Sequence, residues 1–404
     1  MGRVIQYPFG MRLGLAVSFN LTRYFALLNS DVAVSATEAD RECILTPGGQ
    51  ITAAGFYVGA HTITTSHTVY TLRVNGADTS LVITVPAGAS NRWHHSTGGP
   101  VTIAAKDRVC WKVVTPNTSG SITIQNSYFD GICDGVHAQW WFIGMRSTAG
   151  NGLTNHGVWG NGSANTVASS STVAKVAGTV RSLSWRSGTN GRAVVDTATF
   201  MKSGATTTLE VATTASTQAN VEDLVSPVTL AFDDVYAMRI VWGASAGAMA
   251  SCITASFEPN GSAYPILGQL AQAIAAGGTL YFHLGGFARG WAAEADVQTY
   301  MTQPGTLSNF DVRMAANTLS VASTLTLRKN GVATGVVFTI GASSSATVSD
   351  SDTVSVVRGD LLDWEVVVPA GTGSLSSPTV NFSFTPTPSS VPFSQPPRFI
   401  RRWR

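Results

Sequence analysis

Thr71–Gly76 reads Thr-Leu-Arg-Val-Asn-Gly, and the pattern returns at Thr326–Gly331 as Thr-Leu-Arg-Lys-Asn-Gly. A more distant copy, Thr-Phe-Met-Lys-Ser-Gly, lies between them at Thr199–Gly204. The final glycines of the three copies are 128 and 127 residues apart. A period of this length corresponds to a whole domain, because the repeats of solenoids and propellers are only about 20–50 residues long. The sequence therefore predicts one domain present three times.

Other landmarks keep the same register around these hexapeptides. Val101–Pro116 and Val354–Pro369 share the placement of an Asp, a Trp and a final Pro, and Val228–Gly243 is a weaker match. This agreement over long stretches indicates a repeated fold and not a short repeated motif. An aromatic and apolar run opens each copy: Tyr24–Leu28, Trp140–Ile143 and Leu280–Leu284.

Local patterns within each copy are typical of β-strands and hairpins. Apolar and polar residues alternate in Tyr70–Val74 and Leu81–Val85, which is the pattern of strands with one buried face. The Asn-Gly pairs at 75–76 and 330–331 favour type I′ hairpin turns, because both central residues of that turn need a positive φ. About eight such strands in each copy predict an all-β protein of three tandem jelly-roll-like β-sandwiches with extended N- and C-terminal arms.

The landmarks divide the chain into five segments. Only 265–274 has the punctuation of a helix, with Pro265 at its start and Gly277 after its end, so we expect a connector helix there. Met11–Leu21 resembles a signal peptide, but Pro8 precedes it and Arg12 interrupts it, so an arm that packs on a neighbour is the better interpretation. The expected segments are an N-terminal arm 1–23, sandwiches 24–133, 134–262 and 263–386, and a proline-rich C-terminal arm 387–404.

The composition restricts the class of protein. Charged residues make up 12% of the 404 residues and the net charge is +2, so the overall charge does not point to nucleic acid or membrane as partners. No apolar run has the ~18 residues of a membrane-spanning segment. Abundant small and β-branched residues are typical of an extracellular or virion surface. The four cysteines are Cys43, Cys110, Cys133 and Cys252, and they contain no Cys-x-x-Cys pair. We expect buried free thiols in preference to a disulfide framework, although the sequence leaves the pairing open.

Three sets of residues have the chemistry of candidate catalytic or metal sites. Gly243–Gly247 matches Gly-x-Ser-x-Gly around Ser245, but it lies between two expected strands, whereas a nucleophile elbow needs a strand followed by a helix. Asp107 and Asp360 recur in short turns, where they are expected to accept backbone hydrogen bonds. The first unit has four histidines in expected loops, His61, His67, His94 and His95, but their spacing is not that of metal ligands. No metal, cofactor or catalytic residue is therefore expected.

Aromatic residues supply the candidate binding sites. Trp93, His94 and His95, in an expected long loop, could stack on a sugar ring or form a contact between subunits. Trp111 and Trp364 recur inside apolar strands and are expected in the core. The C-terminus combines basic and apolar side chains, which favours an anchor on a partner protein over a nucleic-acid site: Arg398, Phe399, Ile400, Arg401, Arg402, Trp403 and Arg404.

Two motifs of this sequence resemble repeats in structural proteins of tailed bacteriophages. One is the Thr-Leu-Arg-x-Asn-Gly-x-x-Thr hairpin at Thr71–Thr79 and Thr326–Thr334, and the other is the Val-x-Val-x-x-Gly-Asp pattern that begins at Val354. The resemblance covers the first and third copies well and the second poorly. It implies jelly-roll domains of a tail appendage, fibre, baseplate or capsid decoration on the exterior of a virion. The implied partners are other virion proteins in a homo-oligomeric or multi-copy assembly, and no catalytic residue is implied.

Two other functional classes remain as alternatives. An adhesin that recognises a host surface glycan would use Trp93, His94 and His95. A secreted carbohydrate-active enzyme would need paired acidic residues facing one cleft, and the 23 Asp and Glu residues, spread over three copies, show no convincing pair.

Overall fold

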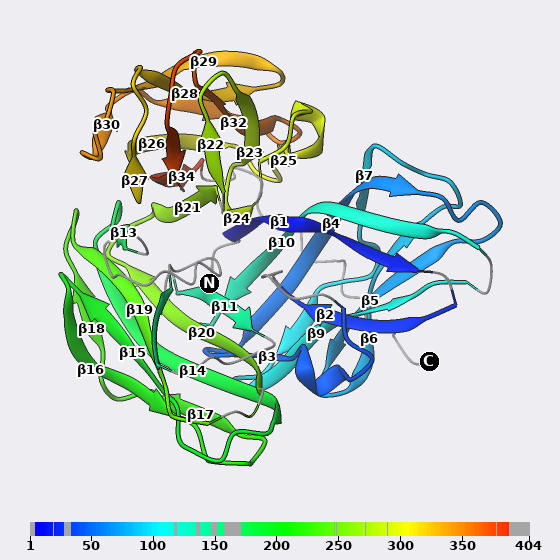
Figure 1. Ribbon diagram of the computed structural model, residues 1–404. Coiled ribbons are helices and arrows are strands. Elements are labelled where there is room, and N and C mark those ends of the chain that lie inside the picture. Colours follow the sequence, from blue (N-terminus) through cyan, green and yellow to red (C-terminus); the bar gives the residue numbers. More distant parts are fainter. Residues whose placement is uncertain are drawn as a thin grey trace, which may run out of the picture.

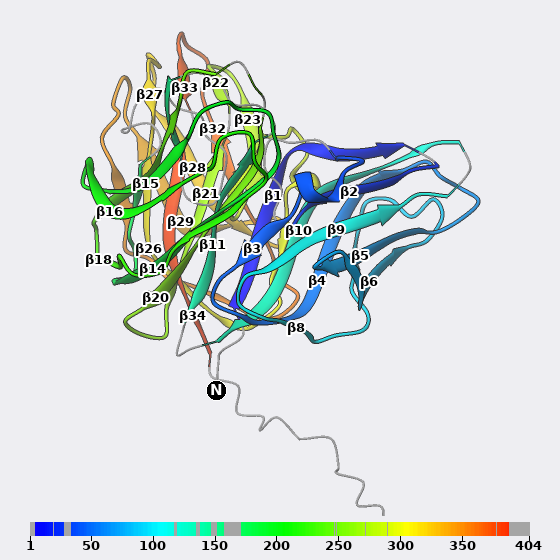
Figure 2. The same ribbon diagram turned by 90° about the horizontal axis from the view of Figure 1, so that it is seen from below.

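The computed structural model describes residues 5–18, 20–27, 34–116, 119–134, 138–146, 152–156, 171–245, 247, 249–270, 272–288, 290–376 and 378–387. Three β-sandwiches lie around a common centre (Figure 1), and Figure 2 shows them turned by 90°. Apart from two 3₁₀ turns, η1 (Glu38–Asp40) and η2 (Glu294–Asp296), the regular structure of the described residues is all β.

The first unit consists of two antiparallel sheets. One has the order β1-β10-β4-β7, with β8 also on β4, and the other has the order β2-β9-β5-β6, with β3 also on β9. The strands are β1 (Ile5–Ser18), β2 (Thr22–Ala26), β3 (Cys43–Leu45), β4 (Gly49–His61), β5 (Thr68–Val74), β6 (Ala77–Val85), β7 (Arg92–His95), β8 (Val101–Ile103), β9 (Asp107–Val114) and β10 (Ser121–Cys133).

The second unit has the same two sheets. Their orders are β11-β20-β14-β17, with β18 on β14, and β12-β19-β15-β16, with β13 on β19. The strands are β11 (Gln139–Arg146), β12 (Gly152–His156), β13 (Thr172–Val173), β14 (Gly178–Asn190), β15 (Thr197–Lys202), β16 (Ala205–Ala212), β17 (Asn220–Asp223), β18 (Val228–Leu230), β19 (Val235–Trp242) and β20 (Met249–Pro259).

The third unit repeats the plan and adds a small sheet. Its main sheets are β24-β21-β34-β26-β30, with β31 on β26, and β23-β32-β28-β29, with β25 on β32; the added sheet is β22-β33-β27. The strands are β21 (Tyr264–Leu270), β22 (Ala273–Ala275), β23 (Thr279–His283), β24 (Gly286–Ala288), β25 (Thr299–Tyr300), β26 (Gly305–Arg313), β27 (Ala316–Asn317), β28 (Ser323–Lys329), β29 (Val332–Ile340), β30 (Val348–Asp350), β31 (Val354–Val356), β32 (Leu361–Val367), β33 (Ser374–Ser376) and β34 (Thr379–Pro386).

The strand order defines each unit as a jelly roll. If the additional strands are set aside, eight strands of each unit lie in two facing sheets of four, for example β1-β10-β4-β7 and β2-β9-β5-β6, which is the arrangement that two Greek keys produce. The second unit keeps this order although its sequence has diverged most. The predicted all-β fold of three jelly-roll sandwiches is therefore confirmed.

The repeated hexapeptide folds as predicted. It ends the strand before a two-residue turn in all three units, and both turn residues have positive φ. The angles are 51° and 82° at Asn75 and Gly76, and 52° and 78° at Asn330 and Gly331. In the second unit Ser203 takes the asparagine's place at φ 50°.

Aromatic side chains fill each sandwich. Trp111 in the first unit and Trp364 in the third are buried, as predicted. Trp111 packs against Phe25 on β2, its neighbour in the same sheet, and against Phe56 on β4 of the facing sheet, with ring centroids 6.4 and 5.1 Å away. Each unit thus has its own apolar centre, which burial of large rings stabilises.

The expectation that residues 1–23 stay outside the sandwich is wrong for their described part. Ile5–Ser18 pairs with β10 from Ile5 opposite Gly131 to Ser18 opposite Ser121. Ile5, Tyr7 and Val17 are buried in the core, so the segment gains apolar contacts that a free arm would lack. Pro8 is compatible with this position because β1 lies at the edge of its sheet.

The expected helix at 265–274 is also wrong. Tyr264–Leu270 is the strand β21, which pairs with β34, and Ala273–Ala275 is the strand β22. Pro265 lies in the part of β21 that has only one neighbouring strand, because β24 pairs with β21 only at Gly268–Leu270. A proline is tolerated at such an edge. The pairing partners come from about a hundred residues away, so the local pattern could not show them.

Within the described part of the chain, no helix has the length and apolar character needed to cross a membrane. The last described residue is 387, so the predicted anchor residues at the C-terminus lie outside the described residues.

Candidate functional site: the junctions between the three units

The Gly-x-Ser-x-Gly loop is a turn, as predicted. Ser245 lies between β19 and β20, and its Oγ accepts hydrogen bonds from the backbone N–H groups of Ala193 and Gly247. Below it, Arg192 and Asp196 form a fully buried ion pair at 2.6 Å. Arg192 donates to the carbonyl of Gly247, so the pair holds the loop closed. The arrangement uses Ser245 as a turn residue.

The recurring aspartates also have the expected role. Asp107 Oδ2 accepts from the N–H of Ala104 at 2.7 Å, and Asp360 Oδ2 accepts from the N–H of Val357 at 2.8 Å. Such bonds stabilise turns.

The histidines of the first unit were expected in solvated loops; this is wrong for His61 and His94, whereas His95 is exposed but lies in a strand. His61 ends β4 and is buried, while His94 and His95 lie in β7. Burial lowers the pKa of His94 to about 4 and lowers the pKa of His61. Among the described residues, no three His, Cys, Asp or Glu side chains are grouped as metal ligands would be.

Trp93 was expected in a long loop, but β7 is a strand that pairs with β4. Its ring packs against Tyr128 of the first unit and Tyr300 of the third, with centroids 5.5 and 6.2 Å away. His95 donates to or accepts from the Tyr128 hydroxyl through Nδ1 at 2.7 Å. The aromatic cluster therefore lies at a junction between two units of the same chain.

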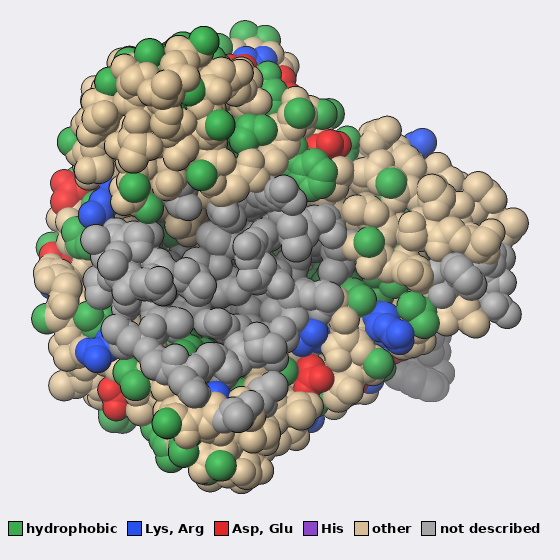
Figure 3. Space-filling model, viewed as in Figure 1, with side chains coloured by type: hydrophobic (Ala, Val, Ile, Leu, Met, Phe, Trp, Pro, Cys, Tyr) green, Lys and Arg blue, Asp and Glu red, His purple; other side chains and the backbone are tan. Residues whose placement is uncertain are grey.

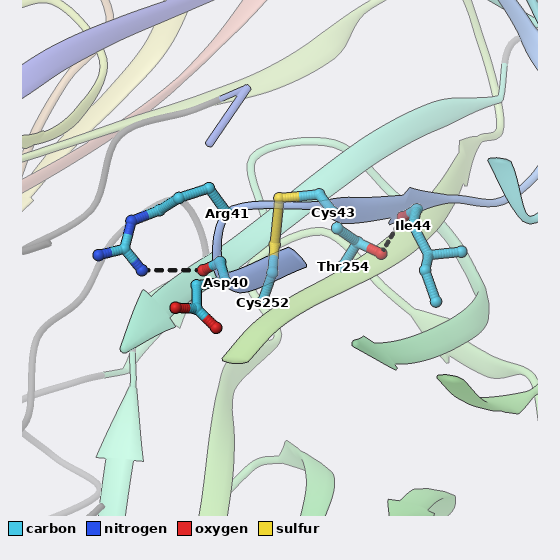
Figure 4. The surroundings of a disulfide bond; sticks show 6 residues. All are labelled: Asp40, Arg41, Cys43, Ile44, Cys252 and Thr254. Atoms are coloured by element: carbon cyan, nitrogen blue, oxygen red, sulfur yellow. Dashed lines mark hydrogen bonds between the residues drawn. A yellow bond between two sulfur atoms is a disulfide. The ribbon is translucent and has the colours of Figure 1, made fainter. Parts of the chain in front are cut away.

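The expectation of free thiols is wrong for two of the four cysteines. Cys43 on β3 of the first unit forms a disulfide with Cys252 on β20 of the second, with a Cα–Cα distance of 5.4 Å (Figure 4). Beside it, Thr254 donates to the carbonyl of Ile44 at 2.7 Å. Cys110 and Cys133 are buried free thiols. The cysteines do not recur among the repeats because this bond joins two different units.

The positions of this disulfide recur at another junction. Cys43 is opposite Val109, two residues before Trp111, and Thr299 is opposite Leu362, two residues before Trp364. Thr299 is thus the counterpart of Cys43 in the third unit.

Asn126 is the counterpart of Cys252 by the same reasoning. Cys252 lies seven residues before Pro259, which pairs with Gly178, and Asn126 lies seven residues before Cys133, which pairs with Gly49. Thr299 and Asn126 meet between the third and first units, and Asn126 donates to the carbonyl of Gln298 at 2.9 Å. The third unit therefore contacts the first as the first contacts the second.

Thr46 and Thr302 occupy equivalent positions, and each donates a hydrogen bond to a carboxylate of the neighbouring unit. Three residues after Cys43, Thr46 donates to Glu222 of the second unit at 2.7 Å. Three residues after Thr299, Thr302 donates to Asp130 of the first unit at 2.8 Å.

At the remaining junction the equivalent residue is a lysine. Lys175 lies three residues after Thr172, the counterpart of Cys43 in β13, and it forms an ion pair with Asp311 of the third unit at 2.7 Å. The three units thus form a ring in which each contacts the next through the same corner, an interface that closes after three steps.

The junctions differ in their charges. Lys106 pairs with Glu222 at 2.7 Å, and Arg186 pairs with Glu42 at 2.7 Å, both between the first and second units. At the junction of the third and first units, Thr302 donates a hydrogen bond to Asp130, and burial raises the pKa of Asp130 to about 7, although the hydrogen bond from Thr302 and the positive charge of Arg358 lower it.

The outer surface matches the low charge of the sequence. In Figure 3 few charged side chains are visible and apolar side chains are scattered among uncharged groups. The exposed large apolar residues belong mainly to the second and third units: Val195, Leu224, Val225, Phe232, Val332, Val337 and Val357.

Comparisons with other proteins give weak results. No family model and no curated protein matches the sequence. Among solved structures, one match is a triple jelly roll from the turret assembly of an archaeal virus. The match covers 93% of this chain and 90% of that chain at 9% identity, with a TM-score of 0.22. The match to a chain of Sulfolobus Turreted Icosahedral Virus covers 92% of this chain and 89% of that chain at 9% identity, with a TM-score of 0.22. The match to PNGF-II covers 95% of this chain and 92% of that chain at 9% identity, with a TM-score of 0.21. These TM-scores are too low to support a conclusion about function.

Proposed function

We propose that this chain is a non-enzymatic structural component of the exterior of a phage virion, in a tail fibre, a baseplate or a capsid decoration. The observation that carries the proposal is the closed ring of three jelly rolls. The charged and polar side chains at its junctions hold one unit to the next, which is a building role. The hairpin repeats that resemble those of phage structural proteins support the same function.

The mechanism that fits is assembly with other virion proteins in multiple copies. A weakly charged surface can pack on neighbours with a small cost of desolvating charge. The C-terminal residues Arg398–Arg404 would add an anchor, because Arg and Trp dominate the binding energy of many interfaces.

Labelling this protein in intact particles and locating it by electron microscopy tests the proposal. The expected result is regular labelling on the outside of the tail or capsid. Absence of the protein from purified particles would contradict it, and so would labelling of Ser245 by a fluorophosphonate probe, which would indicate a hydrolase.

The adhesin alternative has less support. Trp93 already packs against Tyr128 and Tyr300, so less of its ring is available to a sugar. Binding to a glycan array that is lost in Trp93→Ala, with the fold intact, would favour the adhesin.

A further inference from the structure

Lys175, Asp311 and Asn381 form a buried group at the junction of the second and third units. Lys175 Nζ lies 2.7 Å from Asp311 Oδ2, and Asn381 Nδ2 donates to Asp311 Oδ1 at 2.7 Å. The exposed fractions of the three residues are 8%, 1% and 1%. The Asp311 carboxyl group therefore contacts both the amine of Lys175, in the second unit, and the amide of Asn381, in its own third unit.

The backbone explains why Asp311 and Asn381 face the second unit. They are directly opposite each other on β26 and β34. Their neighbours Phe310 and Phe382 stack on each other inside the third sandwich, with centroids 5.4 Å apart. Because successive side chains of a strand point to opposite faces, Asp311 and Asn381 lie on the outer face, where Lys175 reaches them.

Asn381 carries an unusual buried atom. Its Oδ1 is buried and has no hydrogen-bond partner among the described residues. An orphaned buried carbonyl oxygen costs free energy. Rotating the amide by half a turn would place Oδ1 on Asp311, and this needs a proton on the Asp311 carboxyl.

We propose that Lys175 and Asn381 join spontaneously in an isopeptide bond, with Asp311 as the proton-transfer group. Asp311 takes a proton from the Lys175 ammonium group and donates a hydrogen bond to Asn381 Oδ1, which polarises the amide. The neutral amine attacks Asn381 Cγ.

The step balances without a co-reactant. The Nζ–Cγ bond forms and the Cγ–Nδ2 bond breaks. Two of the three protons on the Lys175 ammonium group pass through Asp311 to Nδ2, which leaves as ammonium, and the third stays on the new amide. Nothing is oxidised or reduced.

The surroundings act on this chemistry in both directions. Burial raises the pKa of Asp311, so the carboxyl can hold the proton, and a low-dielectric site favours a neutral amine and acid over the ion pair. The Phe232 ring centroid lies 5.3 Å from Nζ, a cation–π contact that stabilises the charged form of the amine. Burial opposes the charge on Lys175, but hydrogen bonds to Asp233 and Asp311 raise the pKa of this amine. Asp233, which is 59% exposed and 2.6 Å from Nζ, also holds the amine in its charged form, so Asp233 and Phe232 oppose the reaction.

Among the described residues, the equivalent positions at the other two junctions lack the lysine. The counterparts of Lys175 are Thr46 and Thr302, which carry no amine. The new bond would join the second unit to the third as the disulfide joins the first to the second. Only the junction of the third and first units would then remain non-covalent.

The intact mass of the purified full-length protein tests the proposal. We expect a mass lower by one ammonia than that of the disulfide-bonded sequence, and a branched peptide joining Lys175 to Asn381 after proteolysis. Both should be absent in Lys175→Arg, which keeps the charge pair, and in Asp311→Asn. Asp233→Asn should form the bond at least as fast as the wild type.

Three results would overturn the proposal. The first is the unchanged mass with a free Lys175 amine in protein that has the circular dichroism of a folded β protein. The second is the loss of one water with a link from Lys175 to Asp311, which would make the wrong residue the acceptor. The third is the loss of ammonia in Lys175→Arg, which would place the reaction elsewhere.

Discussion

Asn126 on β10 and Thr299 on β25 meet at the junction of the first and third units, at the positions that Cys252 and Cys43 occupy between the first and second. In one junction the pair is covalent, and in the other it is a polar contact of 3.5 Å between Asn126 Nδ2 and Thr299 Oγ1. The two pairs are related by the repeat. The ring therefore has an approximate threefold arrangement within a single chain.

This relationship predicts that Asn126→Cys combined with Thr299→Cys forms a second disulfide. The native pair has a Cα–Cα distance of 5.4 Å, which suits a disulfide, and equivalent positions should have a similar geometry. The bond should raise stability by about 2–4 kcal/mol. Non-reducing peptide mapping checks its formation, with Thr299→Cys alone as the control. Free thiols at both positions under oxidising conditions would argue against the equivalence.

Removing the native disulfide should weaken the ring without unfolding the units. Cys43→Ser with Cys252→Ser releases a link between residues 209 positions apart, and loss of such a long closed loop costs about 2–5 kcal/mol. Each sandwich keeps its own aromatic core. Urea unfolding followed by tryptophan fluorescence measures the loss, and wild type in reducing agent should show the same value. A variant as stable as the oxidised wild type would be inconsistent with this role.

Asp130 should make the wild type less stable as pH rises. Burial raises the pKa of Asp130 from 3.8 to about 7, so its favourable contribution is complete below about pH 4 and is lost as pH rises through about 7. Asp130→Asn should therefore match the wild type at low pH and exceed it by on the order of 3–4 kcal/mol above pH 7. Unfolding both proteins from pH 4 to 8 measures the difference. A constant difference across that range would refute the assignment.

The buried pair of Arg192 and Asp196 should be expensive to break on one side. Asp196→Ala leaves a fully buried guanidinium without its carboxylate and should cost about 3–5 kcal/mol. The double variant Arg192→Met with Asp196→Leu should lose less, because it leaves no unpaired charge. Chemical unfolding of the two variants gives the comparison. Equal losses would mean that packing and not charge dominates at this loop.

Deleting 387–404 should leave a folded, soluble protein that is incorporated poorly into particles. The strand β34 ends at Pro386, so the deletion removes no described strand. Circular dichroism and quantitative analysis of purified particles measure folding and occupancy. Wild-type occupancy, or unfolding of the truncated protein, would contradict the anchor role.

The sequence by itself determined the repeat, the all-β fold and the hairpins. These features are local: a positive-φ turn after an alternating strand is specified by a few adjacent residues, such as Asn330 and Gly331. The turn roles of Asp107 and Ser245 followed from the same kind of local pattern.

The tertiary structure alone decided which residues meet across the ring. Cys43 and Cys252 lie 209 residues apart, and Lys175 reaches Asp311 from another unit. Composition and spacing carry no record of such pairs, because their proximity depends on how three finished domains dock. For the same reason β1 and β21 did not appear as strands in the sequence, since their partners β10 and β34 are distant in the chain.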